Sequence, residues 1–177
     1  VQYGQENTLD ALPPLRRAQP LRSHLPPREA MYVDAWISEF DEPSKTSAKW
    51  VELARMYPDY MPGRGNAAIW LYKENRFDEA LRHAQAAVIP QNPLSGQDSD
   101  TVGRAQLGKE RYDLAQAAFD QAWKSTGGSL RRLVATAAAR RDFVSAQTLA
   151  KQLDADSIYA YIGRTTLAVD QGQFKQP

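Results

Sequence analysis

The chain has 177 residues, of which 42% are hydrophobic and 24% charged, the composition of a folded globular protein rather than a disordered one. Lys and Arg total 22 against 21 Asp and Glu, and this near-balance argues against a nucleic-acid partner, because phosphate binding normally needs a basic surplus. There is no cysteine, which excludes disulfides, thiolate catalysis and cysteine-based metal sites.

Residues 1–27 are proline-rich, and we interpret them as either a linker or an N-terminal cap. Five of the eleven prolines fall in this segment, which rules out a long helix. A short helix over about 14–23 is compatible with them, because proline is tolerated in the first turn of a helix.

Residues 28–177 are predicted to form a domain of helical hairpins. Pro27 followed by Glu29 favours a helix start, whereas Pro43 and Pro58 end the first two helices. Asn75 can adopt the left-handed conformation that ends a helix, and Asp142 is a candidate N-cap. A long loop is expected over 89–100. The predicted hairpins span 28–57, 61–89, 97–126 and 129–153, followed by an unfinished one at 156–177.

One eleven-residue pattern occurs three times, with an aromatic residue, an Ala, a small or aromatic residue and an apolar residue at offsets 0, 3, 7 and 10. These offsets follow one face of an α-helix, so each copy predicts a helix with a buried stripe. The copies are 35 and then 31 residues apart, and Phe174 lies a further 31 on, which leaves room for one partner helix per period. We therefore predict an all-α, right-handed solenoid of helix hairpins. The copies are Phe77, Ala80, Ala84 and Ala87; Tyr112, Ala115, Phe119 and Ala122; and Phe143, Ala146, Ala150 and Leu153.

These residues resemble tetratricopeptide repeats, in which a Gly-containing first helix precedes a turn and then an aromatic residue, an Asp and an Ala. Val102–Gly103 followed by Arg111–Ala115 matches closely, and Arg76–Ala80 matches over its own stretch. The copy at Phe143 is looser because Asp142 precedes the aromatic residue. The resemblance covers about 60–175 well and 28–59 weakly. It implies a module that binds a protein or peptide on its concave face and is not an enzyme.

A narrower resemblance concerns Leu25–Trp36 and Trp50–Tyr60, which look like the C-terminal region of bacterial multidomain signalling proteins that join a cyclase, kinase or winged-helix domain to such repeats. The stretch 87–93 is similar to cyclase-like proteins. This resemblance implies a place in a larger bacterial signalling or regulatory protein, either in the cytoplasm or as the periplasmic part of a membrane-anchored protein. Because the turn pattern starts again at Gly172–Phe174 just before the end, we expect the sequence to be a fragment. No apolar run reaches ~18 residues, so we expect no membrane insertion by this fragment.

The first helix of each hairpin is expected to line a concave groove. Tyr and Arg are typical hot-spot residues in such a surface. Three of the candidates, Ile69, Leu107 and Ile162, fit the interior between hairpins equally well. Counting back from the turns places on the groove Ile69, Tyr72, Lys73, Arg104, Leu107, Arg131, Ala135, Tyr159 and Ile162.

The family resemblance adds Asn66 and Arg132 to the groove. In peptide-binding members of the family, an Asn and basic residues on the first helices hold a ligand carboxylate, and these two residues fall at such positions. The remaining positions hold Pro62, Thr101 and Gly128, so the full carboxylate clamp is not expected.

Neither a metal nor a cofactor site is indicated. The two histidines, His24 and His83, have no second His or carboxylate at ligand spacing and are interpreted as solvated side chains. No serine has a paired base. The stretch Gly63–Asn66 follows no strand and precedes no Lys-Ser or Lys-Thr, which argues against a phosphate loop. It favours flexible entry to a helix or a close backbone approach in the concave groove.

Two alternatives to peptide binding stay open. The first is a self-association module that forms a homodimer, for which we expect an exposed apolar strip around Trp36 and Trp50. The second is a small-molecule sensing domain, which needs an enclosed pocket.

Overall fold

The structure, a computed structural model, describes residues 8–126, 130–154 and 158–173, without the side chains of 8–10, 126 and 159. Every regular element in these ranges is helical, so the predicted all-α solenoid is confirmed. The helices are α1 (Thr8–Ala18), α2 (Pro27–Asp41), α3 (Thr46–Met56), α4 (Met61–Lys73), α5 (Phe77–Ala87), α6 (Ser95–Gly108), α7 (Tyr112–Thr126), α8 (Leu130–Ala139), α9 (Phe143–Ala150) and α10 (Ile158–Asp170), with the short 3-10 helices η2 (Gln19–His24) and η3 (Pro43–Lys45).

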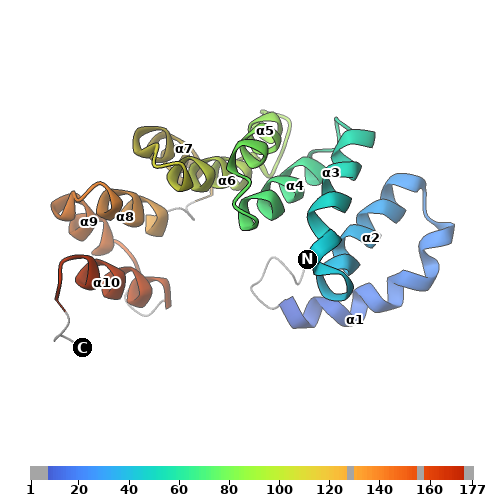
Figure 1. Cartoon of the computed structure of the whole chain (residues 1–177), viewed down its shortest axis with the longest axis horizontal. Coiled ribbons are helices and arrows are strands. Elements are labelled where there is room, and N and C mark those ends of the chain that lie inside the picture. The colour runs from blue at the N-terminus through green and yellow to red at the C-terminus, as the bar shows by residue number, and fades with distance from the viewer. Residues whose placement is uncertain (1–7, 127–129, 155–157, 174–177) are drawn as a thin grey trace.

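The helices pack in consecutive pairs, α2 with α3, α4 with α5, α6 with α7 and α8 with α9, and α10 packs on both α8 and α9. Figure 1 shows the pairs following one another along an arch. The first helices α4, α6 and α8 lie on its inner side, and α5, α7 and α9 lie on its outer side. The inner surface is therefore built from side chains of the first helices.

Three of the turns within hairpins end the first helix in the same way. Asn75, Glu110 and Arg141 all have left-handed backbone conformations, with φ of 60°, 58° and 64°. The residue after each donates its N–H to a carbonyl five residues earlier, which is the Schellman arrangement. The prediction for Asn75 is confirmed, whereas nothing in the residue types of Glu110 and Arg141 indicated a left-handed conformation. The three bonds join Arg76 N to Leu71 O (2.9 Å), Arg111 N to Gln106 O (2.9 Å) and Asp142 N to Ala137 O (3.0 Å).

The second helices bury the small residues of the repeated pattern. Ala80, Ala115 and Ala146 have no exposed surface, as the pattern predicts. Asp142 Oδ1 accepts a hydrogen bond from Ser145 N at 3.1 Å, which confirms the predicted N-cap of α9. Phe119 is also fully buried and lies directly over Gly103 of the preceding helix, so the two helices of this hairpin approach closely.

The first hairpin is held together by aromatic side chains. Trp50 is fully buried and Trp36 is half-buried, and their rings meet edge to face at 5.3 Å between centroids. Tyr32 contacts both tryptophans and Tyr60 in the same manner. The prediction of an exposed apolar strip around Trp36 and Trp50 is therefore wrong, because these side chains pack against one another in the interior.

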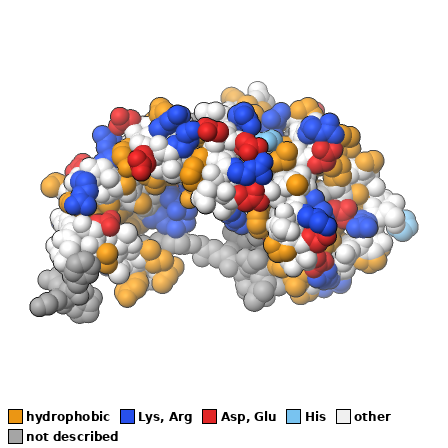
Figure 2. All heavy atoms as spheres, in the orientation of Figure 1, with side chains coloured by type: hydrophobic (Ala, Val, Ile, Leu, Met, Phe, Trp, Pro, Cys, Tyr) orange, Lys and Arg blue, Asp and Glu red, His pale blue; other side chains and the backbone are white. Residues whose placement is uncertain are grey.

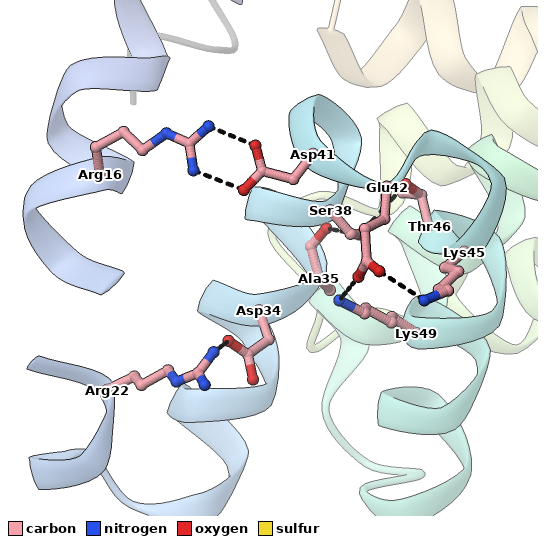
Figure 3. A network of polar contacts seen from close by, with 10 residues as sticks. All are labelled: Arg16, Arg22, Asp34, Ala35, Ser38, Asp41, Glu42, Lys45, Thr46 and Lys49. Atoms are coloured by element: carbon pink, nitrogen blue, oxygen red, sulfur yellow. Dashed lines mark hydrogen bonds and ion pairs between the residues drawn. The ribbon is translucent and has the colours of Figure 1, made fainter. Parts of the chain in front are cut away.

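The N-terminal helices contact α2. Arg16 donates two hydrogen bonds to Asp41, one of 2.6 Å, and Arg22 donates one to Asp34 at 2.7 Å (Figure 3). These pairs are largely exposed, so they orient the segment more than they stabilise it. The prediction of a helix over 14–23 is wrong in its bounds, because α1 begins at Thr8 and tolerates Pro13 and Pro14 inside it. Both α1 and η2 pack on α2.

The segment before α6 is shorter and more ordered than the predicted 89–100 loop, because α6 begins at Ser95. Asn92 organises this connection. Its Nδ2 donates to Ala87 O and to Asp98 Oδ2, both at 2.7 Å, and its Oδ1 accepts from Leu94 N at 3.0 Å. Burial raises the pKa of the Asp98 carboxyl to about 6, although the Asn92 amide opposes that change.

The glycines at the start of α4 serve close packing. Gly63 and Gly65 are buried inside the helix, so the prediction of a flexible entry is wrong. A Cβ at Gly65 would lie 2.5 Å from Asp98 Oδ1, and one at Gly63 would lie 3.3 Å from Leu53 Cγ. The alternative prediction, a close backbone approach in the concave groove, is correct as to the close approach but not as to its place, because the glycines face buried side chains of the interior.

Candidate functional site

The inner side of the arch gathers charged and aromatic side chains from successive first helices. Tyr72 and Lys73 come from the last turn of α4, and Arg104 comes from the middle of α6. Arg131 and Arg132 come from the first turn of α8. In the orientation of Figure 1, Lys and Arg side chains are visible in the hollow beneath the arch (Figure 2).

A single carboxylate lies between the arginines of α6 and α8. Arg104 Nε donates to Asp100 Oδ2 at 2.6 Å, one helical turn away. Arg132 Nε lies 3.8 Å from the other oxygen of Asp100, which is an ion-pair distance but longer than a hydrogen bond. Burial, together with the positive charges of Arg104 and Arg131, lowers the pKa of Arg132 to about 10. Arg132 is thus a partly desolvated cation beside two others.

Two aromatic rings of α4 lie against cations, one on α6 and one on α4 itself. The Arg104 guanidinium lies 5.9 Å from the centroid of the Tyr72 ring, and Lys73 Nζ lies 3.7 Å from the centroid of Trp70. Both are cation–π contacts, which favour a cation over a flat aromatic face. Trp70 Nε1 donates to Glu39 Oε1 at 2.8 Å, so the network extends to α2. Burial also lowers the pKa of Lys73.

A small apolar cavity of about 130 Å³ lies between α8 and α10, next to the arginines. Its wall combines the aliphatic groups of both helices with Arg131 and Arg132 from the first turn of α8. The cavity therefore places an apolar surface directly beside the basic one. The other lining residues are Val134, Ala135, Ala138, Ile162, Gly163, Thr166 and Leu167.

The structure brings most of the predicted groove residues together. Tyr72, Arg104 and Arg132 are linked by a cation–π contact and by Asp100, whereas Lys73 lies on the ring of Trp70. Arg131, Ala135 and Ile162 line the adjoining cavity. The side chain of Tyr159 lies outside the described residues.

The remaining predicted residues have structural contacts. Leu107 packs against a core cluster that includes Phe119 and Leu133, so the interior interpretation is the better one for it. Ile69 is half-buried. Asn66 Nδ2 donates to Pro62 O at 2.9 Å, which uses one of its amide hydrogens within α4.

Not all of the positions that hold a ligand carboxylate in peptide-binding tetratricopeptide repeats face the groove in this chain. Thr101 is 2% exposed and donates to Gln97 O at 3.2 Å, which directs it to the interior. Gly128 lies outside the described residues.

Sequence reasoning missed three groove residues. Asp100 had a local signal, because it lies four residues before Arg104 on the same helix face. Trp70 and Glu39 had none, because they are 31 residues apart and meet only when α2 and α4 pack.

The histidines differ from each other. His24 is exposed, as predicted, whereas the prediction of a solvated His83 is wrong. His83 is half-buried, burial lowers its pKa, and its buried Nδ1 has no hydrogen-bond partner in the described part of the chain. Across the described ranges, no group of three or more His, Asp or Glu side chains is placed to hold a metal ion. Nor does any helix in those ranges have the length and apolar character to cross a bilayer.

The succession of helix pairs, the Schellman turns and the inner groove define a tetratricopeptide-like helical repeat. No family model and no curated protein matches the sequence. Among solved structures, the chain is similar to PilF of Pseudomonas aeruginosa, the subject of a functional characterisation, with a TM-score of 0.70 and 16% sequence identity. The match covers 97% of this chain and 80% of PilF. At this identity the similarity shows the fold alone.

Proposed function

We propose that the chain is a non-catalytic interaction module that binds a protein or peptide segment in the groove formed by α4, α6 and α8. We further propose that it works within a larger bacterial signalling or regulatory protein, to which the segments Leu25–Trp36 and Trp50–Tyr60 show a resemblance. The observation that carries the proposal is the convergence of Tyr72, Arg104 and Arg132, which come from three successive hairpins.

The groove is suited to binding because its side chains are held before a partner arrives. Tyr72 lies against Arg104, and Arg104 is fixed to Asp100 by a hydrogen bond and an ion pair. Ordering a free side chain costs about 0.5–1.5 kcal/mol on binding, so a preordered surface retains more of the contact energy as affinity. Tyr and Arg are also the residue types that most often dominate binding energy.

The test is a selection of peptides from a displayed random library against the chain. Selected peptides should bind the wild type and lose affinity for a groove variant, Tyr72→Ala combined with Arg104→Ala. They should bind normally to Arg82→Ala, a matched control whose side chain is 74% exposed on the outer helix α5. Selected peptides that bind the groove variant as tightly as the wild type would refute the proposal.

Self-association remains a second candidate, favoured by apolar side chains of α10 rather than by the tryptophans. Ile158, Tyr161 and Val169 are 60%, 67% and 50% exposed. Light scattering over a concentration series would show a dimer that Tyr161→Ser weakens. A monomer at all concentrations would remove this candidate and leave the groove.

A further inference from the structure

We infer that the partner segment carries acidic side chains next to one bulky apolar side chain, with the acids against Arg104 and Arg132 and the apolar group in the cavity between α8 and α10. This inference rests on the proposed function and specifies its ligand. It combines two features that lie side by side on the inner surface, a group of arginines and an apolar cavity.

Asp100 compensates the charge of Arg104 better than that of Arg132. Its Oδ2 accepts a 2.6 Å hydrogen bond from Arg104 Nε, whereas its Oδ1 lies 3.8 Å from Arg132 Nε, an ion-pair distance. Arg132 is about three-quarters buried, with 24% of its side chain exposed, so water compensates its charge poorly. Arg104 and Arg131 add positive charge beside it. A carboxylate from a partner would accept two parallel hydrogen bonds from the Arg132 guanidinium.

The cavity has the size and the apolar wall to hold one hydrophobic side chain. A volume of about 130 Å³ is close to the roughly 150 Å³ of an aliphatic-lined cavity that binds benzene, so there is room for one side chain such as leucine. The wall contributed by Val134, Ile162 and Leu167 is apolar, while Arg131 and Arg132 contact the same space. Any segment that places an apolar side chain in the cavity therefore brings its neighbouring residues to the arginines.

A peptide fits this surface better than a nucleic acid. The chain as a whole has a formal net charge of only +1, so it lacks the basic surplus with which proteins attract a phosphate backbone. The cavity also offers an aliphatic wall, whereas nucleic-acid sites typically stack bases on aromatic rings.

The experiment measures fluorescence anisotropy of a labelled, amidated peptide with a short run of glutamates followed by a leucine, flanked by glycine and serine. We expect binding that weakens about tenfold when the glutamates become glutamines, because hydrogen bonds to charged groups are lost. A similar loss is expected when the leucine becomes alanine. Amidation removes the terminal carboxylate, so any acid requirement comes from side chains.

Variants of the chain separate the two halves of the site. Arg132→Gln should weaken binding of the glutamate peptide about tenfold. Asp100→Asn should strengthen binding, because it removes the competing negative charge while its amide oxygen can still accept the hydrogen bond that holds Arg104. Ala135→Phe, at an exposed position on the cavity wall, should abolish the preference for leucine over alanine. Arg82→Gln on α5 is the matched control and should change nothing. If Arg132→Gln fails to fold in a thermal melt, the other two variants still test the inference.

Three outcomes would overturn the inference. The glutamine peptide could bind as tightly as the glutamate peptide, the Asp100→Asn variant could leave affinity unchanged, or a single-stranded RNA homopolymer could bind in place of the peptide. If the library selection yields groove-dependent peptides that are not acidic, the proposed function stands and this inference fails. If it yields no groove-dependent peptides, the proposed function itself fails.

Discussion

The close approach of Gly103 to Phe119 leads to a quantitative prediction about the third hairpin. A Cβ on Gly103 would lie 2.4, 2.5 and 2.8 Å from three carbons of the Phe119 ring, well inside van der Waals contact. Phe119 has no exposed surface and packs with Ala115, Leu130 and Leu133, so the ring has little room to move. The change Gly103→Ala should therefore force α6 and α7 apart.

The magnitude follows from two opposing effects. Overpacking a well-packed interior typically costs about 1–3 kcal/mol. Replacing Gly by Ala inside a helix returns about 1 kcal/mol through helix propensity. We expect a net decrease of about 0–2 kcal/mol in the free energy of unfolding.

The assay is urea unfolding followed by circular dichroism, with Gly163→Ala as the matched control. Gly163 also lies inside a helix, but its added Cβ would lie 3.4 Å from Leu153 Cδ1, an ordinary contact. That variant should be unchanged or more stable by about 0.4–1 kcal/mol. Adding Phe119→Leu to Gly103→Ala should cost less than Phe119→Leu alone, because the smaller side chain relieves the clash. A Gly103→Ala variant as stable as the control, or strictly additive effects in the double variant, would refute the packing argument.

The other predictions concern buried polar groups. Because the pKa of Asp98 is raised from 3.8 to about 6 in the folded state, protonation stabilises the fold, and stability should fall as the pH rises from about 4 to about 6. Asp98→Asn should remove this pH dependence and raise the neutral-pH stability by up to about 3 kcal/mol, measured by urea unfolding at several pH values; an unaltered pH profile would contradict it. Asn92→Ala removes donors to Ala87 O and Asp98 and should cost about 1–3 kcal/mol by the same method, while Gln91→Ala, at an exposed neighbouring position, should be neutral. Trp70→Phe keeps an aromatic face under Lys73 but loses the bond to Glu39, so it should lower thermal stability by about 1 kcal/mol; no change would mean that water replaces the bond.

The predictions that failed share a physical cause. Trp36 and Trp50 are large and apolar at positions that could face either way, and only the packing of α2 on α3 directs them inward. The bounds of α6 and α1 were wrong because tertiary contacts extend these helices through residues that favour loops. Asn92 holds the start of α6, and α1 packs on α2, where Arg16 donates to Asp41. His83 was placed on the solvent side by its helix register, but it is half-buried in the folded chain.

The sequence by itself determined that the chain folds into paired helices and which face α5, α7 and α9 bury. Offsets of 0, 3, 7 and 10 and a period of 31–35 residues are local properties, because they depend only on the geometry of a helix and of its hairpin. Only the tertiary structure decided that Asp100 lies between Arg104 and Arg132, that Trp70 bonds to Glu39 of α2, and that an apolar cavity adjoins the arginines. Those contacts join different hairpins, so they depend on the small rotation from one hairpin to the next, which no residue spacing encodes.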